Sequence, residues 1–233
     1  MIHDKELGLI TFKQSLRAKR MSVRILSNSL QVSLPRGYKE KDGLKFIDEI
    51  REKLLQRQKN VSENSIILTE GKTLTTLTFD VHIQKSTRNT IFASLKSGIL
   101  NIECPQELKL EASQTQTYCW NAISYFLRKE AKITLPKRTQ ILAEHHGFSF
   151  TDVKIQSSKT RWGSCNRKKN INLSFYLMLL PEYLADYVIL HELCHTREMN
   201  HSSRFWEWLD HVTDGKAKTL RNELKKYNIP KFG

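Results

Sequence analysis

The sequence predicts an α+β protein, with a mostly antiparallel β region containing one helix in the N-terminal half and a helix-rich C-terminal half. Short segments in which strand-forming and polar residues partly alternate dominate the first hundred residues. Longer segments with apolar residues at helical spacing dominate the rest, and one of them leads into a His-Glu-x-x-His pattern. We therefore divide the chain into a β-rich region, residues 1–112, and a domain that carries the motif, residues 113–233.

The N-terminal half is expected to hold several short strands around one helix. The first strand candidates are Leu9 to Lys13, Met21 to Leu26 and Leu30 to Leu34, with a hairpin turn suggested at Asn28-Ser29. From Glu40 to Asn60, leucine and isoleucine recur at helical spacing between charged residues, which predicts a helix. Strands resume in Thr73 to Lys85, Thr90 to Leu95 and Ile99 to Cys104, and their succession suggests a meander.

The second half opens with a long helical segment, Gln114 to His145. It is long enough for two helices, and Pro136 marks a kink or a restart. His145 and His146 precede Gly147 at the expected C-terminus, where polar or cationic side chains are favourable, so we interpret them as capping residues rather than a second metal site. Strands are then expected in Phe148 to Gln156 and Asn170 to Phe175, on either side of the basic loop Lys159 to Lys169. Leu220 to Tyr227 predicts a basic terminal helix.

The most informative motif is His191-Glu192-Leu193-Cys194-His195, which follows an apolar run. Positions four apart lie on one face of a helix, so the two imidazoles can converge on one Zn²⁺ while Glu192 projects toward a metal-bound water. The alternative is a core helix whose histidines only pack or form hydrogen bonds. Two imidazoles and a carboxylate are costly to bury in apolar surroundings without partners, and a metal ion would supply one.

A zinc site needs a third protein ligand, and His201 is the next histidine in the chain. At about 100° per residue, a continuous helix would rotate His201 away from the face that His191 and His195 share. The helix must therefore end first. Asn200 tolerates a left-handed conformation, and the two serines after His201 could cap a following helix.

Composition excludes some classes of protein. A chain of 233 residues with 39% hydrophobic content can bury a substantial core. No run of roughly 18 apolar residues is present, and the first six residues lack the apolar core of a signal peptide, so we expect a cytoplasmic protein with no membrane span. The four cysteines form no Cys-x-x-Cys pair, which indicates neither a disulfide framework nor a cysteine zinc knuckle.

The formal net charge of +14 is unevenly distributed. Residues 170–214 around the motif hold 2 basic and 7 acidic groups, whereas residues 1–60 hold 14 and 7 and residues 116–169 hold 11 and 3. An acidic segment inside a basic protein suits capture of a cation at the centre and attraction of an anionic partner at the rim. Weak nucleic-acid binding is therefore one hypothesis, and a merely solvated basic surface is the other.

Further segments add a resemblance to a known family. They are Lys159-Thr160-Arg161-Trp162-Gly163-Ser164-Cys165, Asn172-Leu173-Ser174, Leu179-Leu180-Pro181, Val188 to His195, Met199-Asn200-His201-Ser202, Phe205-Trp206 and the basic stretch Arg17 to Arg24. Together they resemble the YgjP-like metallopeptidase family over nearly the full length. The resemblance implies a zincin-type fold, related to the SprT-like and WLM groups, with His191, His195 and His201 as ligands and Glu192 as the catalytic base.

In such a fold a strand edge beside the metal pairs with an extended substrate, and Asn172-Leu173-Ser174 is the candidate edge. After His201, the apolar residues Phe205, Trp206 and Leu209 predict a short helix that covers the site. Arg161 could orient a substrate carbonyl, carboxylate or phosphate, or it could stack on Trp162 and lock the loop. The oxyanion-stabilising group stays open among Tyr176, Tyr183, Tyr187 and Arg161.

Three functions are compatible with these residues. The first is a zinc-dependent metallopeptidase with one Zn²⁺ per chain, in which a metal-activated water attacks the peptide carbonyl and Glu192 is the general base. The second is a metal-dependent hydrolase of nucleoside triphosphates or another anionic small molecule. The third is a non-catalytic zinc module that binds nucleic acid or protein. Manganese, nickel or iron can use the same three histidines.

Overall fold

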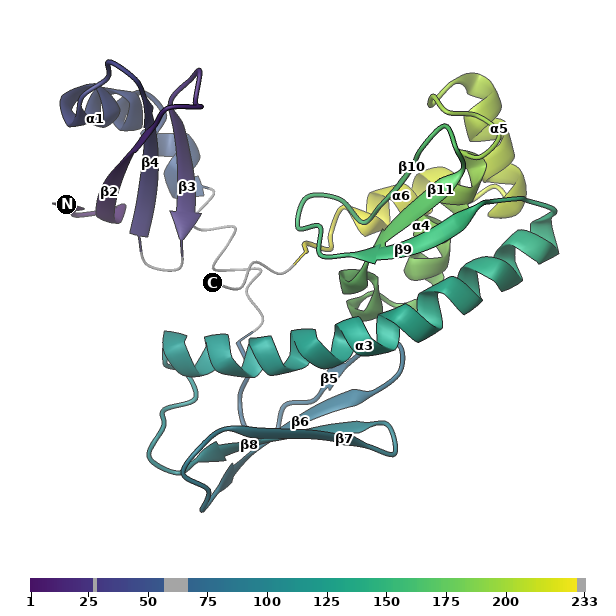
Figure 1. Ribbon diagram of the computed structural model, residues 1–233, viewed down its shortest axis with the longest axis horizontal. Coiled ribbons are helices and arrows are strands. Elements are labelled where there is room, and N and C mark those ends of the chain that lie inside the picture. Colours follow the sequence, from purple (N-terminus) through teal and green to yellow (C-terminus); the bar gives the residue numbers. More distant parts are fainter. Residues whose placement is uncertain (27–28, 57–66, 230–233) are drawn as a thin grey trace. The chain divides into compact units, whose positions relative to one another are not determined.

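The computed structural model describes residues 1–26, 29–56 and 67–229, and the chain forms two compact units that divide after residue 66 (Figure 1). The first unit is a small sheet with a helical layer. The second contains two further sheets and most of the helices, so the predicted α+β class is confirmed. The prediction that residues 113–233 form the catalytic domain concerns function and stays a prediction.

The first unit has a four-stranded sheet in the order β1-β2-β4-β3. Its elements are β1 (Ile2–Asp4), β2 (Gly8–Ser15), β3 (Ser22–Leu26), β4 (Ser29–Pro35) and α1 (Glu40–Glu49), and residues 51–56 are also helical. The central strands β2 and β4 are parallel, and the two outer pairs are antiparallel. The three predicted strands and the helix are confirmed, while Asn28 of the predicted turn and the helical residues 57–60 lie outside the described residues.

Alternation along these strands decides which face is buried. Ile10 on β2 and Leu30 and Val32 on β4 are fully buried, and they pack with Ile47 of α1. Gly43 of α1 lies directly over the sheet, because an added Cβ would be 2.7 Å from a ring carbon of Phe12. The helix therefore covers one face, and the other face of the sheet carries the polar residues.

The second unit begins with another four-stranded sheet, in the order β5-β6-β8-β7. Its strands are β5 (Leu74–Thr75), β6 (Asp80–Ser86), β7 (Phe92–Lys96) and β8 (Ile99–Pro105). The predicted meander is wrong, because β8 pairs in parallel with β6 and places β7 at the outside. The two strands with alternating buried residues, Val81 and Ile83 on β6 and Leu100 and Ile102 on β8, occupy the centre, where one face is protected from water.

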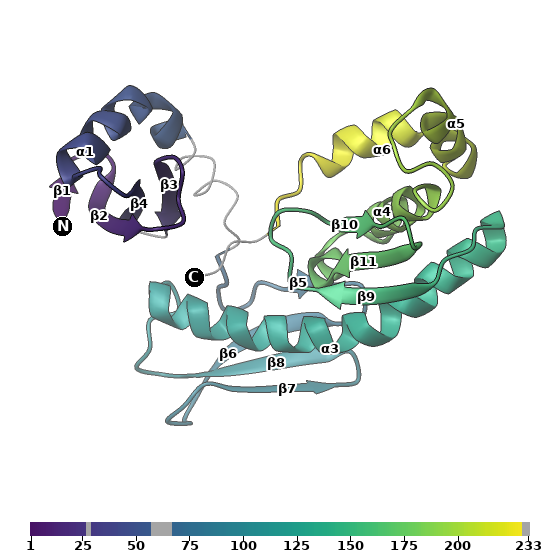
Figure 2. The same cartoon turned by 45° about the horizontal axis from the view of Figure 1, so that its top comes forward.

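One uninterrupted helix, α3 (Ser113–His146), runs through Pro136, so of the two predicted outcomes, a kink or a restart, the restart is wrong. Buried residues recur every fourth position from Ile123 through Leu127, Ala131 and beyond, and this continuous stripe stabilises the helix across the proline. Its first half covers the second sheet and its second half lies beside β9, as both views show (Figures 1 and 2). The helix ends at His146, and Gly147 follows in the left-handed conformation with φ 67°, as the capping interpretation predicts.

A third, three-stranded sheet has the order β10-β11-β9. Its strands are β9 (Asp152–Gln156), β10 (Gly163–Cys165) and β11 (Asn170–Ser174). The predicted edge, Asn172-Leu173-Ser174, is wrong because β11 is the central strand and pairs on both sides. Part of the basic loop folds back as β10 through a turn in which Asn166 Oδ1 accepts hydrogen bonds from the backbone of Lys168 and Asn170. The edge strand beside α4 is therefore β10 (Figure 2).

The C-terminal part of the second unit is helical. It contains the 3₁₀ helix η1 (Phe175–Leu179) and the helices α4 (Glu182–Cys194), α5 (Ser203–Val212) and α6 (Ala217–Leu224). Arg138 of α3 binds both carboxylate oxygens of Asp186 at 2.6 and 2.7 Å, which ties α3 to α4. None of the helices within the described residues combines the length and the apolar composition that crossing a bilayer requires.

Candidate metal centre and active site

Helix α4 places the first two histidines of the motif on one face at its C-terminal end. The helix is apolar nearly all round, since Leu184, Val188, Ile189 and Leu193 are buried together with most of their neighbours. Such a helix lies inside the protein and cannot rotate to expose another face. The chain therefore fixes the direction in which His191 and His195 project.

The helix ends before His201, as the geometry of the motif predicts. Its last residue is Cys194, and His195 is the C-cap in a right-handed conformation. The prediction that Asn200 adopts a left-handed conformation is wrong. The chain turns earlier, through backbone hydrogen bonds to the carbonyl of Cys194. Ser202 is the N-cap of α5 and its side chain accepts from the backbone of Phe205 at 3.4 Å, which confirms a serine cap.

The turn brings the three histidines together. The ligand atoms of His191, His195 and His201 all lie within 4.8 Å of one another, and no other group of three His, Cys, Asp or Glu in the described part of the chain could hold a metal ion. The Nε2 atoms of His191 and His201 are 3.1 Å apart. A separation of this order is what two imidazoles that face one cation would show.

Phe205 of α5 forms the base of the cluster. Its fully buried ring lies 4.6 to 4.9 Å from the ring centroids of all three histidines and is stacked on His195. His195 Nδ1 lies 3.0 Å from the carbonyl oxygen of Glu198, so this nitrogen donates and Nε2 keeps its lone pair. The ring orientation of His195 is thus set from both sides.

Burial keeps the two histidines of α4 neutral. Desolvation, with smaller contributions from His195 and His201, lowers the pKa of His191 to about 3. Desolvation also lowers the pKa of His195, although the hydrogen bond to the backbone of Glu198 acts in the opposite direction and raises it. Neutral imidazoles have a free lone pair, so they are ready to bind a cation without first losing a proton.

Glu192 is the most unusual polar group of the site. It is only 5% exposed, and its Oε2 atom has no hydrogen-bond partner within the described residues. Burial raises the pKa of Glu192 to about 8, and the positive charge of Arg161 opposes the shift. A buried carboxyl group without a partner costs free energy, and groups of this kind are concentrated at functional sites.

Gly163 explains how Glu192 fits. A Cβ at this position of β10 would lie 2.7 Å from both Cγ and Oε1 of Glu192. The backbone of the edge strand therefore passes directly over the carboxyl group, and only glycine leaves space for it. The sequence contained a signal for this contact, a glycine inside the Trp162-Gly163-Ser164 stretch, but not the identity of its partner.

Arg197 braces the turn that carries His201. Its guanidinium lies 4.6 Å from the ring centroid of Phe148 and 4.1 Å from that of Trp208, and it donates to the carbonyl of Gly147 at 2.6 Å. These contacts join the turn to the end of α3 and to α5. No pattern in the sequence pointed to this residue, because its three partners lie at distant or unrelated positions in the chain.

The other candidates from the sequence divide into two groups. Arg161 is close enough to Glu192 for its positive charge to lower the pKa of the glutamate. The predicted stacking of Arg161 on Trp162 is wrong, because other arginines make the cation–π contacts in the described residues. Tyr187 is buried, with its ring 6.2 Å from His191. Tyr183 instead donates to Glu223 of α6 at 2.5 Å. Tyr187 and Arg161 thus lie nearer to the motif than Tyr183.

The residues present fit a divalent transition metal. Three histidine nitrogens converge, one ring is oriented by a second hydrogen bond, and a buried carboxyl group without a partner in the described residues stands beside them. Three histidines are a common catalytic ligand set for zinc, and they also bind other divalent transition metals. A metal bound here would accept the lone pairs of the three imidazoles.

The chain matches one family model and is similar in part to two solved structures. The model of the family described as YgjP-like, metallopeptidase domain, matches residues 19–227. Two solved structures are similar in part, the metallopeptidase zymogens of Pyrococcus abyssi abylysin (25% identity) and Methanocaldococcus jannaschii jannalysin (20% identity). Each has a TM-score of 0.35 and covers 39% of this chain, and 91% and 92% of the two zymogen chains are covered. A comparison with curated proteins finds no significant match.

Proposed function

Because the chain belongs to the YgjP-like metallopeptidase family, we propose that it is a zinc-dependent peptidase whose site is formed by His191, His195, His201 and Glu192. The observation that carries this proposal is the convergence of three histidine nitrogens within 4.8 Å of one another beside a buried carboxyl group. The catalytic domain proposed is residues 113–233, and the cytoplasmic location remains a prediction.

The three histidines would hold the metal through their free ring nitrogens. A zinc ion bound there would polarise the peptide carbonyl and lower the pKa of water toward neutrality. Phe205 and the carbonyl of Glu198 keep His195 in one orientation, and Arg197 keeps the turn of His201 in place. The preformed arrangement reduces the free-energy cost of assembling the site.

Glu192 would carry the proton. A general base is most effective when its pKa lies near the working pH, and burial already raises the pKa of this carboxyl group to about 8. A bound cation would lower that value by stabilising the carboxylate. Oε2 of Glu192 is the atom available for the proton, because it has no other partner in the described residues. The same carboxyl group would then return the proton to the leaving amine.

The edge of β10 would align the substrate. Among the described strands this one pairs with β11 alone, and its Gly163 lies against Glu192. An extended peptide that adds to the open edge would form backbone hydrogen bonds without requiring particular side chains. It would also bring a peptide bond close to Glu192. We therefore assign the pairing with an extended substrate to the edge strand β10 and no longer to β11.

The test combines metal content with hydrolysis. We would measure zinc per chain in the purified protein, and turnover of unstructured fluorogenic peptides and of nucleoside triphosphates. The variant is Glu192→Gln, which keeps the shape of the side chain and removes the base. Its matched control is Glu207→Gln on α5, whose side chain is exposed. We expect one zinc per chain in all three proteins, and peptide hydrolysis only in the wild type and the control.

Each other result has a definite meaning. Unchanged hydrolysis in Glu192→Gln contradicts the role of Glu192 as base. Cleavage of triphosphates alone replaces the peptidase by a phosphoanhydride hydrolase. A protein without bound metal, even after incubation with zinc, contradicts the ligand assignment.

A further inference from the structure

The two compact units contain the same arrangement of strands. The first sheet has the order β1-β2-β4-β3 and the second has the order β5-β6-β8-β7. In each sheet the two central strands are parallel, and both outer pairs are antiparallel. A helix follows the fourth strand in both, α1 in the first unit and α3 in the second, and lies across one face of the sheet (Figure 1).

The pairing agrees residue by residue. The central parallel pairs each contain seven residue partners, and each ends with a serine opposite a proline, Ser15 with Pro35 and Ser86 with Pro105. An arginine follows two residues after each serine, Arg17 in the first sheet and Arg88 in the second. The first unit is therefore a second copy of the four-stranded module on which α3 packs.

The two copies differ at the open face of the sheet. In the second unit, Arg88 is neutralised within the module: its Nε donates to Glu103 at 2.6 Å and its guanidinium lies 4.3 Å from the ring centroid of Phe92. Phe92 and Glu103 are direct cross-strand partners. The equivalent cross-strand pair in the first unit is Ser22 and Ser33, so Arg17 meets neither a carboxylate nor an aromatic ring at these positions.

The charged side chains of β2, β3 and the loop between them are all basic. Residues 7–39 contain seven basic residues and no acidic residue. Five of the basic side chains are exposed and belong to β2, β3 and the loop between them, and none of the ion pairs among the described residues involves them: Lys13, Arg17, Lys19, Arg20 and Arg24.

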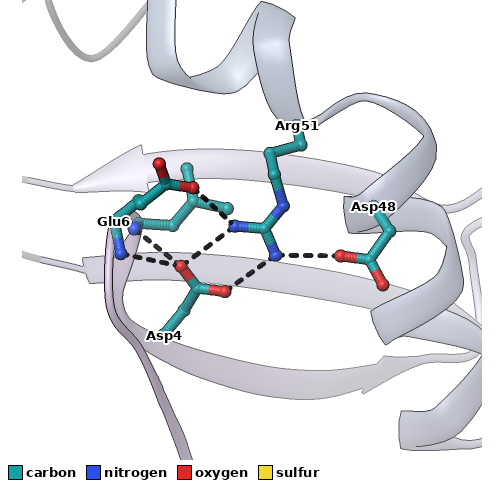
Figure 3. Close-up of polar contacts among 5 residues, drawn as sticks. Asp4, Glu6, Asp48 and Arg51 are labelled. Carbon is teal, nitrogen blue, oxygen red and sulfur yellow. Dashed lines mark hydrogen bonds and ion pairs between the residues drawn. The ribbon is translucent and has the colours of Figure 1, made fainter.

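The acidic residues of the unit lie elsewhere. Arg51, which follows α1, binds Asp4 at 2.8 Å, Asp48 at 2.9 Å and Glu6 at 3.3 Å (Figure 3). Asp42 accepts from the backbone at the start of α1. The negative charges are thus gathered at β1 and on the helix, and they do not neutralise the open face of the sheet.

We propose that this basic face of the first unit, formed by Lys13, Arg24 and the loop from Arg17 to Arg20, binds the phosphodiester backbone of nucleic acid. Lys13 and Arg24 lie on strands that are separated by β4, so they are about 10 Å apart across the sheet. With the loop from Arg17 to Arg20 they form a basic surface that is wider than a single phosphate group. A nucleic-acid strand offers several phosphates to such a surface, because it carries one at every nucleotide.

The same face indicates which kind of nucleic-acid binding is expected. Its other described residues on the three longer strands are small, polar or aliphatic, namely Leu9, Thr11, Ser15, Ser22, Ser29, Gln31 and Ser33. They include no aromatic ring on which a base could stack, so recognition rests on phosphate contacts. Binding should be independent of sequence and should weaken steeply with salt.

The experiment measures binding of the full-length chain to fluorescent 20-nucleotide single-stranded DNA, RNA and duplex DNA as a function of salt. The test variant replaces Lys13, Arg17 and Arg24 by glutamine. The matched control replaces Lys41, Lys45 and Lys53 by glutamine, which removes the same charge from the exposed side of the helical layer. Thermal unfolding and circular dichroism establish that both variants are folded.

We expect the test variant to bind about a hundredfold more weakly at 0.1 M salt, with a salt slope lower by about 2 to 3, and the control to change affinity by less than about threefold. A charge-preserving variant, Lys13→Arg with Arg17→Lys and Arg24→Lys, should bind like the wild type. Comparison of the affinities for single-stranded DNA, RNA and duplex DNA decides which nucleic acid the face binds best. Failure of the wild type to bind, an equal loss in the control variant, or tighter binding of polyglutamate than of nucleic acid would overturn the proposal.

Discussion

Gly163→Ala tests whether the edge strand holds Glu192 in place. The added methyl group would lie 2.7 Å from Cγ and Oε1 of Glu192 and 2.9 Å from Cδ. Ordinary contact begins at about 3.4 Å, so the carboxyl group or the strand must move by about 0.7 Å. Glu192 is buried on its helix, and therefore cannot simply swing into solvent.

The magnitude follows from this displacement. Overpacking a buried site usually costs about 1–3 kcal/mol of stability. A misplacement of about 1 Å can reduce the rate about a hundredfold, so a shift of about 0.7 Å should lower kcat by between about tenfold and a hundredfold. The three atoms nearest to the new methyl group all belong to Glu192 and none to a histidine, so bound metal should stay at the wild-type level.

The assay measures kcat on an unstructured fluorogenic peptide, metal per chain and thermal unfolding. Ser164→Ala, the next position of β10, is the matched control and should leave kcat nearly unchanged, because its side chain points to the other face of the strand. In a Glu192→Ala background the Gly163 methyl group has space, so its effect on stability should largely disappear. Full activity of Gly163→Ala, or the same destabilisation in both backgrounds, would refute this account of the contact.

Three further substitutions test other parts of the structure. Arg197→Met should weaken zinc binding about tenfold in a competition titration with a chelator, because the brace on the turn is lost, whereas Arg204→Met should have little effect. Phe205→Leu removes the ring that packs on the histidines and should also raise the rate of zinc loss to the chelator; an unchanged rate would mean that the ring does not orient them. Asp4→Asn should destabilise the first unit by about 1 kcal/mol at pH 7, measured by hydrogen exchange of residues 1–56. The hydrogen bond from Arg51 holds the pKa of Asp4 well below its usual range, so this stabilisation is present at neutral pH. It should decrease as the pH falls from about 4 toward the lowered pKa of folded Asp4, and a difference between the variant and the wild type that does not shrink between about pH 5 and pH 2 would contradict this origin.

Local patterns predicted a large part of the fold. The strands β2, β3, β4 and β8 and the helix α1 lie where alternation and helical spacing placed them. These signals are strong because each element must bury one face, and the period of its apolar residues follows from its own geometry. The end of α4 before His201 could also be predicted from local sequence. A continuous helix cannot bring a residue six positions after His195 back to the same face.

Signals of comparable strength failed where a distant contact decided the outcome. Pro136 is a helix breaker in isolation, yet α3 continues through it because its buried stripe packs along its whole length. The segment around Asn172 has the composition of a strand, but its position in the sheet depended on whether the loop after Gln156 would supply another strand. Composition cannot give the order of strands, because hydrogen bonds between strands join residues of any separation in the chain.

The sequence by itself determined the residue pattern from which a metal centre is predicted. The spacing of His191, Glu192 and His195 on a helix, with His201 beyond its end, predicts a metal centre with a carboxyl group beside it, because side-chain direction repeats with the helical period. Only the tertiary structure decided what surrounds that centre, namely Gly163 over Glu192 and the aromatic ring of Phe205 beside the histidines. It alone also showed that one four-stranded module is repeated in both units. These features depend on contacts between segments far apart in the chain, which form when apolar faces are buried together and which no local pattern specifies.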